Sequence, residues 1–399
     1  MYALILGLLL LVLTITSVFL QRSPDIQPSS RVLRTSNFIL TYQADISKQK
    51  VEQFAAGLEA AYKHLVVREK LHDGVHKWTL KGPFLSVTYQ CLPTIAAHEF
   101  FHSMQLQYPL KLADRFLLEG TATWAMREVF PESAECYQET LEDWLVGGTD
   151  YSSVKLLSRG YQGGLFWNYL AERYGGAQLI RRLFEHPDIR LGIDWPKVLS
   201  ILTGKSFLDL WDEFAVALAT HQVPDAAQLF PLAEQKTNYV PVPVYGGEWT
   251  GQLLTIDQIN WQNPFVEICE KKKEFCPLAH DVAVIGSPLT VRHPYGIHFL
   301  RIIPKANTPL VLQFNGSSDT DFRVYVVGSK NSTAYETSPL MPGCILSNPL
   351  DYQFLQVVIT RGEKGSGSYQ VKLAPLQNQN YAKCFAQNTP SEQYLKTPT

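Results

Sequence analysis

The chain has 399 residues, enough for two or three domains that each bury a hydrophobic core. Apolar residues make up 46% of the sequence and charged residues 18%, which excludes an intrinsically disordered chain. The 35 Lys and Arg residues against 37 Asp and Glu give a net charge of -2, so there is no basic excess for holding a nucleic-acid backbone, and we expect no nucleic-acid partner.

An uncharged apolar segment extends from Met1 to Leu20. Its length fits a secretory signal or a single membrane anchor, and residues 1-21 are predicted to be one or the other. The first charged residue is Arg22, and a stretch rich in Pro and Ser follows it. We therefore expect an exported protein that is secreted, periplasmic or anchored outside the cytoplasm, with residues 1-20 in the membrane if they are not cleaved.

Six cysteines, an even number, are spread along the chain: Cys91, Cys136, Cys269, Cys276, Cys344 and Cys384. They contain no CxxC pair of the zinc-ribbon kind, so three disulfides formed in an oxidising compartment are the simpler interpretation. Buried free thiols are the alternative. Cys269 and Cys276 flank a short charged loop and are expected to pair. Taken alone, the arginines after the apolar segment would place the rest of an uncleaved, anchored chain in the cytoplasm. The cysteines favour export instead, and we give them more weight.

Hydrophobic periodicity places the first elements. In chain order they are a strand at 38–42, a helix at 47–70, a strand at 85–89 and a predominantly helical stretch from Thr94 to about Gln222. Ser206 followed three residues later by Asp209 has the spacing of a capping box at a helix start. A linker rich in Pro and Gly follows at 240–247.

Beyond the linker the apolar period changes to two, which is typical of strands. The predicted strands are 297–302, 310–314, 322–326 and 369–373. They predict an all-β sandwich of roughly immunoglobulin size. We therefore expect an α+β protein: a short mixed sheet with a mostly helical domain at 31-235, a β-sandwich accessory domain at 245-385, and a loose tail at 386-399.

The sequence HEFFH at positions 98–102 is an HExxH motif. On a helix, residues four apart differ by about 40° in angular position, so the imidazoles of His98 and His102 project from one face. That spacing can place two nitrogens on a single Zn²⁺. Glu99, beside them, can accept the proton of a water at the ion and is the candidate general base.

A second segment, LLEGTATWA at 117–125, supplies a candidate third ligand. Tyr108 and Pro109 give the turn signal that can reverse the chain into a second helix. Glu119 on that helix can complete a His₂Glu site with one open position. Thr123, one turn further, is a candidate hydrogen-bond partner of a ligand.

These two motifs, HEFFH and LLEGTATW, resemble those of the gluzincin clan of zinc metallopeptidases, which includes thermolysin. The greatest similarity is to bacterial metalloproteases whose zinc helix reads HEFFH and whose ligand helix reads EGxAxW. The resemblance extends from about Asn37 to about His221 and includes the helical segment 160–175. It implies a zinc-dependent peptidase with the two histidines and Glu119 as ligands and Glu99 as general base.

The resemblance also implies a donor to the oxyanion that forms on the attacked carbonyl. The similar families carry a tyrosine after the ligand helix, which makes Tyr161 the candidate; His186 and His221 are alternatives, and a purely structural role for Tyr161 is the other interpretation. The chain lacks a GxMEN motif, which disfavours an aminopeptidase. It also leaves only about 27 residues between Lys70 and His98, which predicts an abbreviated sheet.

The sequence thus predicts zinc-dependent hydrolysis of peptide bonds, expected to be endopeptidase activity on a peptide or protein substrate. One alternative is a weakly active or inactive binding protein on a peptidase scaffold. Another is an adhesion protein in which the β-sandwich is the interaction module. Glu99 favours the enzyme, because a protein that only binds needs no general base. The oligomeric state is left open.

Overall fold

The computed structural model describes residues 30–80, 89–110, 113–136, 160–161, 163–189, 194–225, 242–244, 283–290, 295–304, 309–331, 334–340, 342–365, 367–376 and 381–385. The predicted signal or anchor at 1-21, the loop cysteines Cys269 and Cys276, and the predicted tail at 386-399 lie outside them. Within the described ranges, no helix is both long enough and apolar enough to cross a membrane. The fold class is α+β, as predicted.

The chain divides into two compact units. The first comprises Met1–Tyr108 and Ala125–Ser133, and the second comprises Pro109–Trp124 and Ala134–Thr399. Helix α4 (Arg115–Val129) contributes residues to both units.

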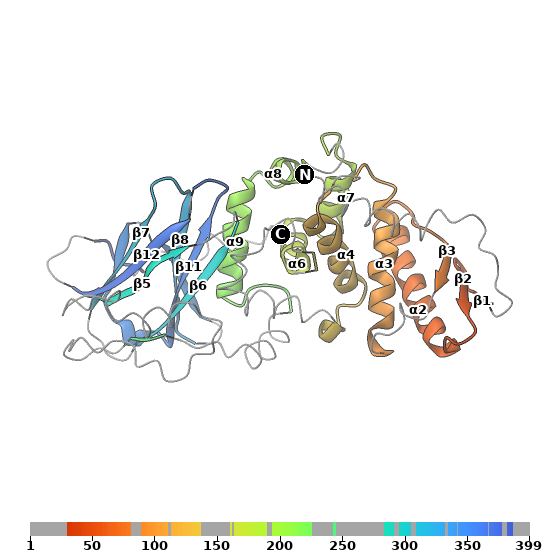
Figure 1. The fold of residues 1–399 in the computed structure, drawn as a ribbon, viewed down its shortest axis with the longest axis horizontal. Coiled ribbons are helices and arrows are strands. Elements are labelled where there is room, and N and C mark those ends of the chain that lie inside the picture. Colours follow the sequence, from red (N-terminus) through yellow and green to blue (C-terminus); the bar gives the residue numbers. More distant parts are fainter. Residues whose placement is uncertain are drawn as a thin grey trace. The chain divides into compact units, whose positions relative to one another are not determined.

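The first unit contains a three-stranded mixed sheet (Figure 1). Its strands are β1 (Ser30–Arg34), β2 (Ile39–Gln43) and β3 (Lys77–Leu80). β2 pairs antiparallel with β1 and parallel with β3. Leu40 and Tyr42 on β2 are buried and alternate with more exposed neighbours, so one face of the strand packs into the core. The predicted short mixed sheet is confirmed. Of the predicted strand at 85–89 only Tyr89 is described, and it begins a 3-10 turn.

The helices of this unit are α2 (Lys48–Ala61), the π-helical segment η1 (Tyr62–Arg68) that continues it, and α3 (Leu92–Gln105) after the 3-10 turn η3 (Tyr89–Cys91). α2 and α3 lie side by side (Figure 1). They approach closely at Gly57, where a Cβ atom would stand 2.6 Å from Pro93 Cα. Pro93 suits the first turn of α3, because the N–H group it lacks would have no partner inside the helix. The predicted helix at 47–70 is therefore α-helical to residue 61 and π-helical beyond it.

The second unit packs its helices around aromatic side chains. The helices are the first part of α4, then α6 (Gly163–Tyr174), α7 (Ala177–Glu185), α8 (Trp195–Thr203) and α9 (Phe207–Ala219). Phe116 stacks on Trp195 with ring centroids 5.9 Å apart, and its carbonyl accepts the indole N–H of Trp167 at 2.9 Å. These three side chains are fully buried. The predominantly helical stretch is confirmed, and the capping box forms between Ser206 and Asp209.

Small residues allow α6 to approach α4 closely. A Cβ atom on Gly120 would lie 2.6 Å from the Trp167 ring, and one on Gly164 would lie 2.6 Å from Thr123 Cβ. The two glycines therefore leave the space that the Trp167 and Thr123 side chains of the facing helix occupy. This contact fixes the part of α4 that carries Glu119.

Two sheets form the strand-rich part of the second unit. The first runs β10 (Gly343–Leu346), β7 (Leu310–Gly316), β12 (Ser368–Pro375) and β5 (Ala283–Thr290), and the second runs β4 (Val242–Val244), β6 (Ile297–Pro304), β11 (Phe354–Arg361), β8 (Phe322–Ser329) and β9 (Tyr335–Pro339). Buried side chains of both sheets form one hydrophobic cluster. All four predicted strands fall within β6, β7, β8 and β12.

A buried polar group joins α9 to this strand-rich region. α9 packs on β8 and β11, and the Asp212 carboxylate accepts hydrogen bonds from Arg323, Tyr325 and Thr360. Burial raises the pKa of Asp212 to about 6 despite these donors, which lower it. The carboxylate of α9 is therefore hydrogen-bonded and ion-paired by side chains of the adjoining sheet.

The described cysteines are all in disulfides. Cys344 on β10 is bonded to Cys384, and Cys91 and Cys136 are each disulfide-bonded as well. Free thiols are therefore excluded at these four positions. Such bonds persist in oxidising compartments.

Candidate metal centre

Both histidines of the HExxH motif lie on α3, as the spacing predicts. Their Nε2 atoms are 3.0 Å apart, and the rings meet edge to face with centroids 4.6 Å apart. His98 is buried and His102 is half-buried. Phe100 and Met104, on the opposite side of α3, and Phe101, beside His98, are buried and fix the rotation of the helix. One face of α3 thus presents two imidazole nitrogens to the same point.

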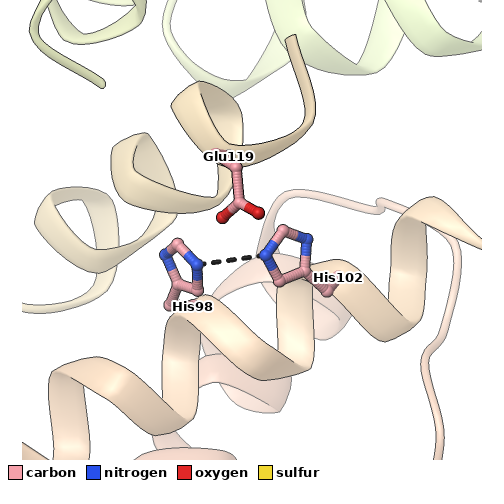
Figure 2. A group of neighbouring side chains, drawn as sticks. All are labelled: His98, His102 and Glu119. Atoms are coloured by element: carbon pink, nitrogen blue, oxygen red, sulfur yellow. Dashed lines mark hydrogen bonds between the residues drawn. The ribbon is translucent and has the colours of Figure 1, made fainter. Parts of the chain in front are cut away.

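Glu119 joins these histidines from α4. One ligand atom from each of His98, His102 and Glu119 lies within 4.8 Å of the others. Figure 2 shows the carboxylate of Glu119 directed at the two imidazoles across the gap between the helices. The three residues that were predicted as ligands are therefore brought together as a group that could hold a metal ion.

The donors fit a divalent transition metal. Two imidazole nitrogens and one carboxylate oxygen suit zinc and its neighbours, whereas magnesium and calcium favour oxygen ligands. Two nitrogens that each lie about 2.1 Å from one ion would be roughly 3.0 to 3.4 Å apart at angles between right and tetrahedral. The observed separation of 3.0 Å agrees with that range.

Gln105 orients one of the two rings. Nδ1 of His102 lies 2.7 Å from the side-chain oxygen of Gln105, one turn further along α3. An amide oxygen only accepts, so Nδ1 carries the proton and Nε2 keeps its lone pair for a ligand bond. Gln105 is buried, which fixes its side chain. Gln105 was not predicted as a site residue, although its position three residues after His102 on the same helix face was a usable signal.

Glu99, the candidate general base, lies on α3 directly after His98 and is half-buried. It does not belong to the group of three ligands. Thr123 uses its hydroxyl to donate to the backbone carbonyl of Glu119 at 2.9 Å. It therefore contacts the main chain of the ligand residue, one turn back along α4.

Tyr161 lies beside the segment that faces Glu119. A Cβ atom on its neighbour Gly160 would be 3.1 Å from Glu119 Cγ, and the Tyr161 side chain is 52% exposed. Of the two alternatives, His186 ends α7 and accepts the backbone N–H of Asp188 on Nδ1 at 3.1 Å. The other, His221, lies 6.0 Å from the Tyr335 ring. The role of an oxyanion donor stays a prediction for Tyr161.

No known protein family matches this chain, and no curated protein matches it either.

Proposed function

We propose that this chain is a zinc-dependent peptidase of gluzincin type, exported from the cytoplasm and acting on a peptide or protein substrate as an endopeptidase. The observation that carries the proposal is the convergence of His98, His102 and Glu119 from two helices. The disulfides support export, since such bonds persist in oxidising compartments.

Zinc is the ion that this donor set favours. Catalytic zinc sites use three protein ligands of this kind and leave a fourth position open for water or substrate. When bound, zinc would polarise the substrate carbonyl and lower the pKa of water toward about 7. Gln105 holds His102 in the tautomer that such a ligand needs.

In the proposed reaction, the chain's own side chains move the protons. Glu99 accepts a proton from the attacking water and passes it to the leaving amine, which is the work of a general base that then acts as an acid. Tyr161 donates its hydroxyl proton in a hydrogen bond to the developing oxyanion. The Tyr161 side chain is 52% exposed and is therefore accessible to a substrate.

The test combines metal content with peptide cleavage. Elemental mass spectrometry of the purified full chain should find zinc, and Glu119→Ala should lose the zinc of the HExxH centre. Glu132→Ala, which alters an exposed glutamate just after α4, is the matched control and should keep the metal. Cleavage of a mixed peptide library, followed by mass spectrometry, should then report activity.

Glu99→Gln distinguishes a peptidase from an inactive binding protein on a peptidase scaffold. A peptidase should keep its zinc in this variant and lose cleavage by several orders of magnitude, because the proton acceptor is gone. A wild-type chain that binds zinc but cleaves no peptide would instead favour the inactive binding scaffold. A folded chain that takes up no zinc would refute the metal centre itself.

A further inference from the structure

A second group of metal-ligating side chains lies in the first unit. It consists of His64 on η1, Glu69 at the end of η1 and Glu128 in the last turn of α4. One ligand atom from each lies within 4.8 Å of the others. Nε2 of His64 is 3.2 Å from Oε1 of Glu128 and 3.9 Å from Oε1 of Glu69.

The π-helix is what aligns His64 with Glu69. In an α-helix, residues five apart differ by about 140° in angular position and point to different sides. A π-helix is wound more loosely, with each N–H bonded to the carbonyl five residues back, so residues five apart lie closer in angle; here the N–H of Glu69 bonds to the carbonyl of His64 at 3.0 Å. Segments of this kind are rare and frequently occur at functional sites. The seven-residue π-helix therefore places the His64 imidazole on the same side as the carboxylate of Glu69, the residue that follows it.

We propose that His64, Glu69 and Glu128 form a second binding site for a divalent transition metal of the zinc class. One imidazole and two carboxylates are suitable donors for such an ion. Bonds of about 2.0 to 2.2 Å place neighbouring ligand atoms roughly 3 to 4 Å apart. The separations of 3.2 Å and 3.9 Å fall in that range.

Solvent can reach this group, and the ion pair between Arg68 and Glu69, which would compete with a metal, is exposed on its Arg68 side. The three side chains are 21%, 17% and 24% exposed, so a hydrated ion has access and water can fill the remaining positions. Arg68 Nε lies 3.1 Å from Glu69 Oε1, but the Arg68 side chain is 71% exposed. An exposed ion pair of that kind contributes little and yields readily to a metal.

An ion at this site would connect η1 to the last turn of α4. Its role is therefore structural, because it holds two helical segments together. The inference does not rest on the proposed peptidase activity, since none of its ligands belongs to the HExxH site.

Zinc stoichiometry tests the proposal. The full chain and its variants are equilibrated with Zn²⁺, freed of excess ion and analysed by elemental mass spectrometry. We expect two zinc ions for the wild type and for the control Glu132→Ala. We expect one each for Glu128→Ala and Glu119→Ala, and none for the double variant.

The variants distinguish the two sites. Loss of zinc in Glu128→Ala with full retention in Glu119→Ala would support the second site while removing the HExxH centre. Zinc content unchanged by Glu128→Ala, or a Glu119→Ala protein that binds none, would overturn the second site. Circular dichroism in chelator establishes that each variant is folded, and Glu69→Ala replaces Glu128→Ala if the latter is not. Zinc should also raise the melting temperature of Glu119→Ala but not that of the double variant.

Discussion

Gln105→Leu should weaken zinc binding at the HExxH centre without removing a ligand. Leucine has a similar volume and therefore leaves no room for a water to replace the lost acceptor. Nδ1 of His102 would then carry an unsatisfied proton in a buried place, which costs about 1–3 kcal/mol, or the proton would move to Nε2 and block the ligand atom. Either way, the bound state loses stability relative to the free state.

The size of the effect follows from the partner that is removed. Loss of a hydrogen-bonding partner behind a ligating histidine typically lowers metal affinity about 10- to 100-fold. With a buried partner at 2.7 Å and no water to replace it, we expect the upper end, about 100-fold or 2.7 kcal/mol. Gln105→Glu should retain the affinity, because a carboxylate accepts the same hydrogen bond more strongly.

Competition against a chromophoric zinc chelator measures this affinity. The background is Glu128→Ala, so that the proposed second site does not contribute. Gln107→Leu, which alters an exposed glutamine in the turn just after α3, is the matched control and should bind as the wild type does. A Gln105→Leu protein within twofold of the control would refute the role of Gln105 in orienting His102.

Three further predictions concern stability and are measured by urea unfolding. Asp212 has a pKa of about 6 when folded and about 3.8 when unfolded, so its contribution to the free energy of unfolding should fall by about 2 kcal/mol as the pH rises from 4 to 7. The difference between wild type and Asp212→Asn should show this decrease, and a constant difference would contradict it. Replacing Cys344 and Cys384 together by alanine should lower the free energy of unfolding by about 4 kcal/mol, as expected for a disulfide that closes a loop of 40 residues. A decrease below about 1 kcal/mol would be inconsistent with a loop of that length. Gly164→Ala should cost about 1–3 kcal/mol, because the new methyl group meets Thr123; unchanged stability would show that α4 and α6 can separate at no cost.

The histidine ligands of the HExxH centre could be predicted because sequence spacing on a helix determines which side chains share a face. His98 and His102 share a face whatever surrounds α3, provided that the segment is helical. Glu119 needed one more assumption, a chain reversal near Pro109, and the structure brings it to the histidines. The strands of the second unit were predicted for a similar reason, since a period of two is visible in the sequence itself.

Features that depend on an unusual backbone or on distant partners were not predicted. The spacing of His64 does not mark it as a ligand, because Glu69 lies five positions further along and only the π-helix brings the two together. The third strand at 77–80 is four residues long and has little pattern of its own, and it is recognisable mainly by its pairing with β2. Asp212 has no signal in the sequence, because its hydrogen-bond donors come from the distant strands β8 and β11.

The contrast between Gln105 and Thr123 shows where a motif stops being informative. Each is a polar residue on the same helix as a nearby ligand: Gln105 follows His102 on α3, and Thr123 follows Glu119 on α4. From spacing alone, only Thr123, four residues after Glu119, was predicted to contact a ligand. The hydroxyl of Thr123 instead bonds to the carbonyl four residues back, the common choice for threonine within a helix. Gln105 has a longer side chain that extends past its own backbone to reach the His102 ring. Helical spacing therefore identifies which residues share a face, but the reach of each side chain decides whether it contacts a neighbouring ring or its own main chain.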